Sequence, residues 1–170
     1  MLCDFYGDNT EYQENLLAKY YIKLNHDVTI IASTFRSVFD YYANKYDKGA
    51  PRVEYFDKGA KIIRLPYSIN YLGKIKKYKN IFPILEKEIP DLIFSHDIKF
   101  NLLDAVKYKK INPNCRIIMD CHADYSNSAS NWLSLYILHK VIRKYYLDRA
   151  KVHISKIFPI VPASAKFLNE

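Results

Sequence analysis

Short apolar runs alternate with amphipathic segments along most of the chain. Leu2 to Phe5, Asp27 to Ser33 and Asp91 to Ser95 are apolar or β-branched runs of strand length. Between the first two runs, residues 11–25 (EYQENLLAKYYIKLN) place apolar side chains at helical spacing. A strand, a helix and a second strand in this order form the repeating unit of a parallel α/β fold.

The second half of the chain repeats this alternation. We predict helices over residues 80–88 and 100–110, strands over 115–121 and 158–161, and a last helix from Ala163. A long helix is expected over residues 131–151. Its apolar face would comprise Trp132, Leu135, Leu138, Ile142, Tyr145 and Tyr146, and its basic face Lys140, Arg143, Lys144 and Lys151. The elements predict one domain over residues 1–170, with a doubly wound, mostly parallel Rossmann-like sheet and helices on both faces.

The middle of the chain is less regular. Thr34 to Tyr46 is aromatic and partly helical in pattern. Residues 52–56 and 61–65 flank Asp57-Lys58-Gly59, which predicts an inserted β-hairpin. We expect a loop from Pro66 to Lys79, with a basic cluster formed by Lys74, Lys76, Lys77 and Lys79.

The composition and charge narrow the class of protein. The chain has 170 residues, of which 49% are hydrophobic, enough for a sizeable core. Its net charge of +8 suits a nucleic acid, an anionic membrane surface or a phosphorylated substrate. No nucleic-acid-binding module is recognisable, so we predict no nucleic-acid partner; steep salt dependence of binding would favour one.

Sequence features also indicate the compartment. The three cysteines form no CxxC pair and lie in apolar runs, which argues against a disulfide scaffold or a zinc site and favours a reducing cytoplasm. The N-terminus lacks the pattern of a signal peptide, and no apolar stretch reaches the roughly 18 residues that span a bilayer. Any contact with an anionic membrane would therefore be peripheral.

Candidate site residues follow the predicted strands. In a parallel α/β sheet, ligands bind at the carboxyl ends of the strands. Polar side chains there are expected to converge along one edge, and a histidine there can bond a sugar hydroxyl or support a developing charge. Alternatively, each histidine caps a loop or packs half-buried. The candidates are His122 as the catalytic residue and Asn9, Tyr12, Gln13, His96, Asp97 and Asp124 as substrate-binding residues. We interpret His26, His139 and His153 as ordinary turn or surface residues.

Several catalytic motifs are missing from the sequence. The first loop contains only Gly7, whereas a dinucleotide-binding fingerprint needs GxGxxG. The chain has no GxxxxGK[ST], GxSxG or HExxH motif. The loop from Gly7 to Gln13 nevertheless precedes a predicted helix N-terminus, which attracts phosphate and other anions.

The ordered segments resemble bacterial glycosyltransferase family 4 proteins. Five segments carry the resemblance across nearly the whole chain: YQENLLAKYYIKLNHDVTIIAS, GAKIIRLPY, PDLIFSHD, IIMDCHADYSNSASNWLS and IVPASAKFLNE. Two departures are visible: Asn25 stands where the family usually has Gly, and the first loop lacks the Gly-Gly pair of many members.

The resemblance implies the N-terminal, acceptor-side domain of a two-domain GT-B enzyme. A C-terminal domain carrying an E-x7-E motif would bind the nucleotide-sugar, and transfer would retain the anomeric configuration without a metal or other cofactor. The acceptor would be a surface or capsular polysaccharide or a lipid-linked saccharide. His122 would correspond to the family's histidine near the transferred sugar. The sequence ends inside a predicted helix, so we expect a donor-binding domain to follow, and this chain alone to bind an acceptor without catalysing transfer.

A second interpretation comes from another class of protein. The same alternation of strands and helices is typical of a non-catalytic, flavodoxin-like α/β binding module. An open reading frame encoding a second α/β domain after Glu170 would favour the enzyme, and a stop there would favour the module.

Overall fold

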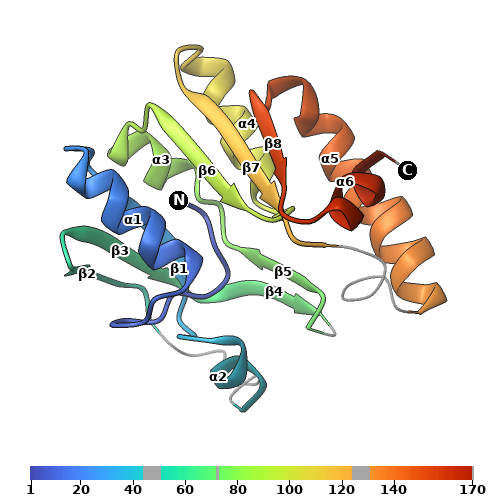
Figure 1. The fold of residues 1–170 in the computed structure, drawn as a ribbon, viewed down its shortest axis with the longest axis horizontal. Coiled ribbons are helices and arrows are strands. Elements are labelled where there is room, and N and C mark those ends of the chain that lie inside the picture. The colour runs from blue at the N-terminus through green and yellow to red at the C-terminus, as the bar shows by residue number, and fades with distance from the viewer. Residues whose placement is uncertain (44–50, 72, 124–130, 170) are drawn as a thin grey trace. The chain divides into compact units, whose positions relative to one another are not determined.

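The computed structural model describes residues 1–43, 51–71, 73–123 and 131–169 (Figure 1). Internal contacts divide the chain into two compact units, Met1–Lys79 and Asn80–Glu170. The protein is an α/β protein with a mixed three-stranded sheet, a two-stranded sheet and a parallel three-stranded sheet. The interpretation of residues 1–170 as one domain stays a prediction.

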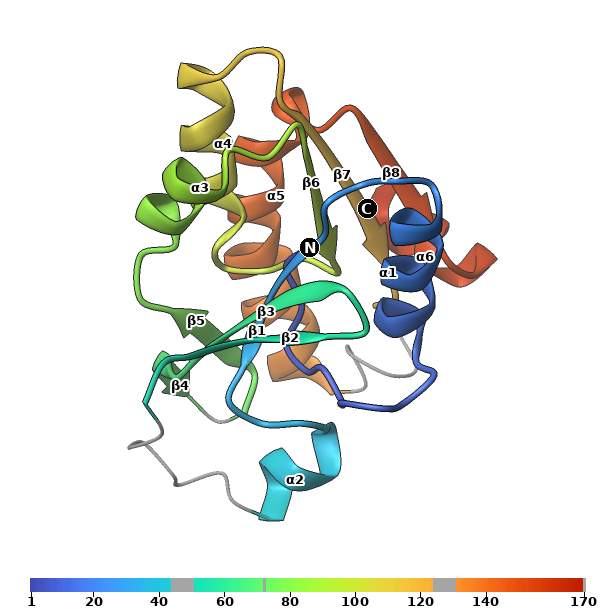
Figure 2. The same ribbon diagram turned by 90° about the vertical axis from the view of Figure 1, so that its left-hand side faces the viewer.

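The first unit is built around the mixed sheet (Figure 2). Its elements are α1 (Gln13–Lys23), β1 (Thr29–Ser33), α2 (Val38–Ala43), β2 (Val53–Asp57), β3 (Ala60–Leu65), β4 (Tyr67–Tyr71) and β5 (Ile75–Tyr78). β3 lies between β1, to which it is parallel, and β2, to which it is antiparallel. Helix α1 packs through Ala18, Tyr21 and Ile22 on the face that contains Ile30 and Ile62, and this packing forms the core.

The predicted N-terminal strand is reduced to one isolated bridge. Leu2 pairs with Ile31 in parallel orientation. The amide of Cys3 donates to the carbonyl of Ile31 over 3.0 Å, and the amide of Ile31 donates to the carbonyl of Met1 over 2.8 Å. The segment thus extends along β1, but the ladder is too short to form a named strand.

The predicted hairpin forms, but it is part of the main sheet. The turn between β2 and β3 has positive φ at both central residues, 49° at Lys58 and 89° at Gly59. A type I′ turn requires this geometry, and Gly59 adopts it without a steric penalty. Because β3 is the central strand, the interpretation of the hairpin as an insertion is wrong.

The loop expected from Pro66 to Lys79 contains two antiparallel strands, β4 and β5. Tyr67 on β4 stacks on Tyr78 on β5 with ring centroids 5.2 Å apart. The ammonium group of Lys76 lies over the ring of Phe5 at 4.7 Å and pairs with Asp4 at 3.0 Å. Aromatic packing across the strands outweighs the polar composition that suggested a loop, and Lys76 is not a solvated member of a basic cluster.

The second unit contains the parallel sheet, in the order β6-β7-β8. Its elements are α3 (Phe82–Glu88), β6 (Leu92–His96), α4 (Leu102–Ile111), β7 (Arg116–Cys121), η1 (Leu133–Arg143), α5 (Lys144–Ala150), η2 (Lys151–His153), β8 (Lys156–Pro159) and α6 (Pro162–Asn169). The central strand β7 buries Ile117, Met119 and Cys121, and α4 packs beside it through apolar side chains. This regular alternation agrees with the prediction from the sequence.

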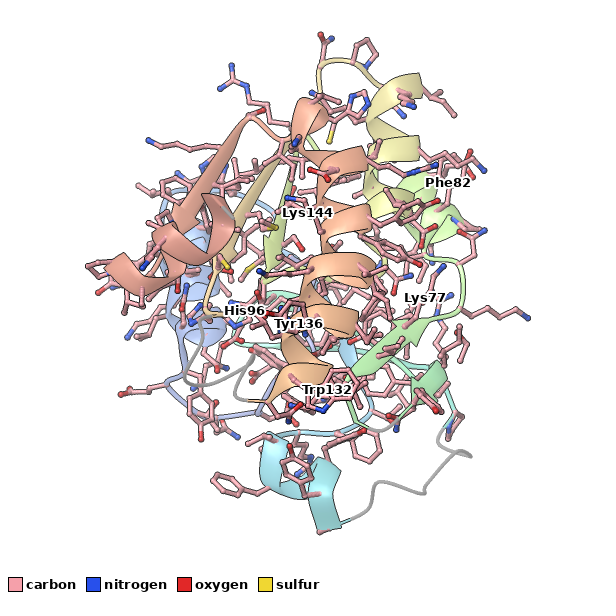
Figure 3. All side chains as sticks on the ribbon, turned by 90° about the vertical axis from the view of Figure 1, so that its right-hand side faces the viewer. Lys77, Phe82, His96, Trp132, Tyr136 and Lys144 are labelled. Carbon is pink, nitrogen blue, oxygen red and sulfur yellow. The ribbon has the colours of Figure 1, made fainter. Side chains whose placement is uncertain are left out.

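The long helix departs from the predicted pattern because η1 is a π-helix. Its hydrogen bonds run from residue i to i+5, so each turn is wider than in an α-helix and side chains four or five apart share a face. Ser134, Leu138 and His139 are therefore buried, whereas Trp132 is 70% exposed (Figure 3). Of the predicted apolar face, Leu138 is buried and Leu135, Ile142 and Tyr146 are half-buried, whereas Trp132 and Tyr145 are exposed. The placement of His139 on the surface is wrong, since His139 is only 5% exposed.

The predicted basic face of the long helix is wrong at one residue. The side chain of Arg143, the last residue of η1, is only 14% exposed and therefore does not belong to a solvated outer face. Lys140 and Lys144, by contrast, remain exposed.

Candidate functional site

Two histidines and an aspartate meet at the carboxyl end of the parallel sheet in the second unit. The strand register pairs His96, the last residue of β6, with Asp120 near the end of β7. Nδ1 of His96 lies 2.9 Å from Oδ2 of Asp120, and Nε2 of His122 lies 3.1 Å from the same oxygen. The two imidazole rings are 4.5 Å apart between centroids. We call these three residues the histidine-aspartate cluster.

Asp120 is the buried centre of this cluster, with 1% of its surface exposed. Its second oxygen, Oδ1, accepts a hydrogen bond from the backbone amide of Asp97 over 2.8 Å. Burial by itself raises the pKa of Asp120, but hydrogen bonds from His96, the Asp97 amide and His122 together outweigh it and hold the pKa below its usual value of 3.8. The cluster therefore contains a buried carboxylate that is ionised at neutral pH.

An ionised Asp120 determines which histidine nitrogens donate to it. A carboxylate only accepts hydrogen bonds, so Nδ1 of His96 and Nε2 of His122 are the donors. The opposite ring nitrogens are Nε2 of His96 and Nδ1 of His122. The His122 side chain is 36% exposed, so the cluster combines a buried anion with an imidazole that a ligand can reach. Such a pair can accept a proton from a hydroxyl or stabilise positive charge.

The turn after β6 connects this cluster to the π-helix. Asp97 has a φ of 66°, in the left-handed region that Asp tolerates better than most residues. This conformation accompanies an amide aimed at Asp120, while the carboxylate Oδ2 of Asp97 lies 3.9 Å from Nη1 of Arg143. Ser95 donates its hydroxyl proton to the carbonyl of Asp97 over 3.0 Å. The turn thus extends the polar network from the sheet edge to Arg143.

The prediction from the sequence omitted Asp120 and Arg143. A lone carboxylate inside the apolar run CRIIMDC was the available signal for Asp120, because a buried charge needs partners. No comparable signal existed for Arg143, since the sequence places it among the basic residues of a helix face.

The donor atoms of the cluster could also bind a metal ion. One atom each from His96, Asp120 and His122 lies within 4.8 Å of the others. Imidazole and carboxylate donors suit first-row transition metals. However, the hydrogen bonds to Asp120 already satisfy its carboxylate without a cation.

The cysteines contribute no reactive group to this site. All three are buried, and none forms a disulfide. Burial raises the pKa of the Cys121 thiol to about 12, so this neighbour of His122 stays protonated at neutral pH and is a poor nucleophile.

The remaining predicted site residues lie elsewhere. Asn9, which has a φ of 60°, and Tyr12, which is 55% exposed, belong to the loop before α1 in the first unit. Gln13 is the first residue of α1. Asp124 lies outside the described residues. Of the seven candidates, the structure therefore brings His96, Asp97 and His122 together in one unit.

A second buried charge, Arg64 at the end of β3, holds the first loop in place. Its guanidinium donates to Tyr55 Oη at 2.8 Å, the Ser33 carbonyl at 3.1 Å, the Tyr6 carbonyl at 2.9 Å and Asp8 Oδ1 at 3.1 Å. Burial, followed by the hydrogen bond to Asp8, raises the pKa of Tyr55 to about 12 and keeps this phenol a donor. Arg64 thus stabilises the fold, and its hydrogen bonds to the protein occupy its donors.

No known protein family, curated protein or solved structure matches this chain. Within the described residues, no helix combines the length and the apolar character needed to cross a membrane.

Proposed function

We propose that this chain is the acceptor-binding, N-terminal part of a retaining glycosyltransferase of the GT-B type. In this proposal, both units belong to a doubly wound, Rossmann-like acceptor domain, and a separate C-terminal domain binds the nucleotide-sugar donor. The acceptor is a growing surface or capsular polysaccharide or a lipid-linked saccharide. The observation that carries the proposal is the histidine-aspartate cluster at the carboxyl ends of β6 and β7, the edge where parallel α/β sheets bind ligands.

His122 has the central role in this proposal. Its exposed imidazole bonds a hydroxyl of the reacting sugar through Nδ1, because Nε2 is held by Asp120 at 3.1 Å. If the ring gains positive charge during transfer, the buried carboxylate stabilises it. Asp120 is the positioning residue, since it fixes the tautomer and the orientation of the ring without touching the sugar.

The other candidates would bind the acceptor. His96 shares Asp120 with His122, so its ring is held in the same way at 2.9 Å. Asp97 and Asp124 would accept hydrogen bonds from sugar hydroxyls. Asn9, Tyr12 and Gln13, in the first unit, stay predicted substrate-binding residues, and Tyr12 offers an exposed ring for the apolar face of a sugar.

The first test measures saccharide binding by this chain. Isotope-labelled protein is titrated with a panel of mono- and disaccharide glycosides, and NMR follows the histidine rings and the Asp97 amide. We expect one class of glycoside to shift these signals, His122→Ala to abolish the effect, and His153→Ala, in the same unit, to leave it unchanged. If no glycoside moves these signals, the proposal fails and the flavodoxin-like binding module becomes the better interpretation.

The second test measures transfer. In a polypeptide that joins this chain to a donor-binding domain with the E-x7-E motif, we expect His122→Ala to lower kcat about 100-fold, the scale of a positioned acid or base. His153→Ala is again the control. Near-normal transfer by the His122 variant would refute the role given to this residue.

A further inference from the structure

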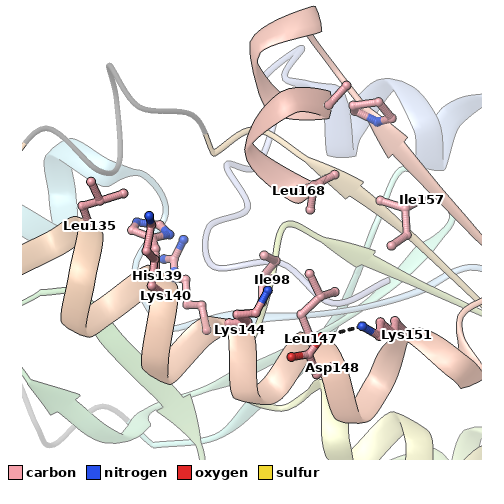
Figure 4. Close-up of a pocket in the computed structure, with 13 residues that line it drawn as sticks. Ile98, Leu135, His139, Lys140, Lys144, Leu147, Asp148, Lys151, Ile157 and Leu168 are labelled. Atoms are coloured by element: carbon pink, nitrogen blue, oxygen red, sulfur yellow. Dashed lines mark hydrogen bonds and ion pairs between the residues drawn. The ribbon is translucent and has the colours of Figure 1, made fainter. Parts of the chain in front are cut away.

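A pocket separate from the histidine-aspartate cluster lies entirely within the second unit. It has a volume of about 540 Å³, within the range of small-molecule sites. One wall consists of η1, α5 and the start of η2, and the facing wall includes Ile157 on β8 and Leu168 on α6 (Figure 4). We call it the basic pocket.

The lining of the basic pocket is strongly cationic at one wall. Four basic side chains, Lys140, Arg143, Lys144 and Lys151, line it together with a single carboxylate, Asp148. Asp148 pairs with Lys151 at 2.6 Å and also interacts with Lys144, and Asp97 lies 3.9 Å from Arg143, so the four basic side chains outnumber these two carboxylates. The excess of positive charge in a concave site favours an anionic ligand.

The hydrogen bonding of Arg143 also indicates an anionic ligand, independently of the net charge of the pocket. Its Nε and Nη1 are buried, and within the described part of the chain neither has a hydrogen-bond acceptor. The nearest carboxylate oxygen, on Asp97, is 3.9 Å from Nη1, beyond hydrogen-bond distance. Buried guanidinium nitrogens without acceptors are costly, and the oxygens of a phosphate match the fork of donors on an arginine.

Helical spacing explains why these groups face the pocket. His139, Arg143 and Leu147 follow one another at intervals of four residues, and so do Lys140, Lys144 and Asp148, so these side chains share one side of the continuous helix formed by η1 and α5. The π-helix η1 is a rare element, and π-bulges occur frequently at functional sites.

Apart from His139, the rest of the lining is aliphatic. Ile98, Leu135, Leu147, Ile157 and Leu168 contribute the apolar surface. Among the described lining residues, none has a phenyl, phenol or indole ring on which a nucleobase would stack. The combination suits a phosphate group attached to an aliphatic body.

We propose that the basic pocket binds a phosphate or diphosphate ester with an aliphatic tail, whose phosphate contacts Arg143, Lys140 and Lys144. This binding stands on the pocket alone. Its assignment as the carrier of a lipid-linked acceptor rests on the proposed function.

The test compares three probes by calorimetry with this chain. These are geranyl diphosphate, geraniol and inorganic pyrophosphate. We expect geranyl diphosphate to bind at least 10-fold more tightly than pyrophosphate, and geraniol to bind too weakly to measure. Equal affinities for geranyl diphosphate and pyrophosphate would overturn the assignment of an aliphatic tail, and no binding of either would overturn the pocket as a phosphate site.

Variants identify where the probe binds. We expect Arg143→Met and Lys144→Met each to weaken geranyl diphosphate binding at least 10-fold, with Arg143→Lys intermediate because it keeps the charge and loses the fork. Arg149→Met is the matched control: it removes the same charge from α5, the helix that follows η1 and contains Lys144, but Arg149 lies against the Tyr145 ring at 4.3 Å and does not line the pocket. An equal loss in the Arg149 variant would show non-specific attraction and refute the site.

A vesicle experiment separates the pocket from general attraction to a membrane. Vesicles of phosphatidylcholine with 30% phosphatidylglycerol would bind Arg143→Met and Arg149→Met equally if only surface charge mattered. We expect Arg143→Met to lose geranyl diphosphate binding, while its vesicle binding falls no further than that of Arg149→Met. If Arg143→Met lost vesicle binding in parallel with geranyl diphosphate binding, the pocket would be refuted. If His122→Ala lost saccharide binding and kept geranyl diphosphate binding, the result would support the basic pocket as a site distinct from the saccharide site.

Discussion

The two units each bury an arginine, and the two arginines are in opposite states. Arg64 in the first unit donates to two side chains and to backbone carbonyls, all within 3.5 Å. Arg143 in the second unit is 14% exposed at its side chain, yet its Nε and Nη1 have no acceptor among the described residues. Burial of a charge is therefore a poor guide to function by itself. The two donors of Arg143 without acceptors make it a candidate ligand-binding residue, whereas Arg64, whose donors are used within the protein, is a structural clamp.

Replacement of Arg64 should have the largest effect. We expect Arg64→Met to lower the free energy of unfolding by about 3–5 kcal/mol, because it leaves Asp8 and several buried carbonyls without their donor. Urea denaturation measures the change. Arg36→Met is the control. Arg36 also pairs with Asp8, but its side chain is 73% exposed and the two charged atoms are 3.8 Å apart. A loss below about 1 kcal/mol would contradict the assignment of Arg64 as a clamp.

Replacement of Asp120 should have an intermediate effect that depends on pH. Folding lowers the pKa of Asp120 below 3.8, so its carboxylate stabilises the fold above that pH and this contribution disappears as pH falls through the lower folded-state pKa. We expect Asp120→Asn to cost about 1–3 kcal/mol at pH 7, and the two proteins to converge in stability at acid pH. Urea denaturation between pH 2.5 and 7 checks this, with the exposed Asp91→Asn as control. A constant difference across the range would contradict the role of the ionised carboxylate.

Replacement of Arg143 should change stability little. We expect Arg143→Met to alter the free energy of unfolding by less than about 1 kcal/mol, because an apolar side chain removes the cost of the unsatisfied donors. The same urea experiment compares it directly with Arg64→Met. If both variants lost the same stability, the contrast between the two arginines would disappear.

Removal of metal ions should have no effect. The hydrogen bonds to Asp120 satisfy the histidine-aspartate cluster without a cation, so we expect EDTA to leave the melting temperature and saccharide binding unchanged. Thermal unfolding and NMR titration before and after dialysis measure this. Loss of binding after EDTA that Zn²⁺ restores would make the cluster a metal centre instead.

Much of the second unit was predictable because β6 and β7 are largely buried on both faces. Residues 91–95 and 115–121 are apolar runs between helical patterns, and they form β6 and β7 within one or two residues of the predicted bounds. The rule that ligands bind at strand ends selected His96, Asp97 and His122 before their contacts were known. The catalytic and binding roles of these residues stay predictions.

The predictions that the structure contradicts were wrong for two physical reasons. β4 and β5 form through aromatic stacking of Tyr67 on Tyr78, which a polar, lysine-rich sequence does not reveal. The apolar face of the long helix was wrong at Trp132 and Tyr145, which are exposed, and its spacing assumed 3.6 residues per turn, whereas η1 is a π-helix. In both cases contacts distant in sequence or an altered hydrogen-bond register overrode the local pattern.

The sequence by itself determined the alternation of strands and helices and the polar residues at the ends of β6 and β7. These depend on local apolar patterning, which every α/β unit must satisfy to bury its sheet. Only the tertiary structure decided that Asp120 joins the two histidines and that Arg143 turns inward to a basic pocket. Those features depend on strand register and on the pitch of one helix, and both are set by packing among residues far apart in the chain.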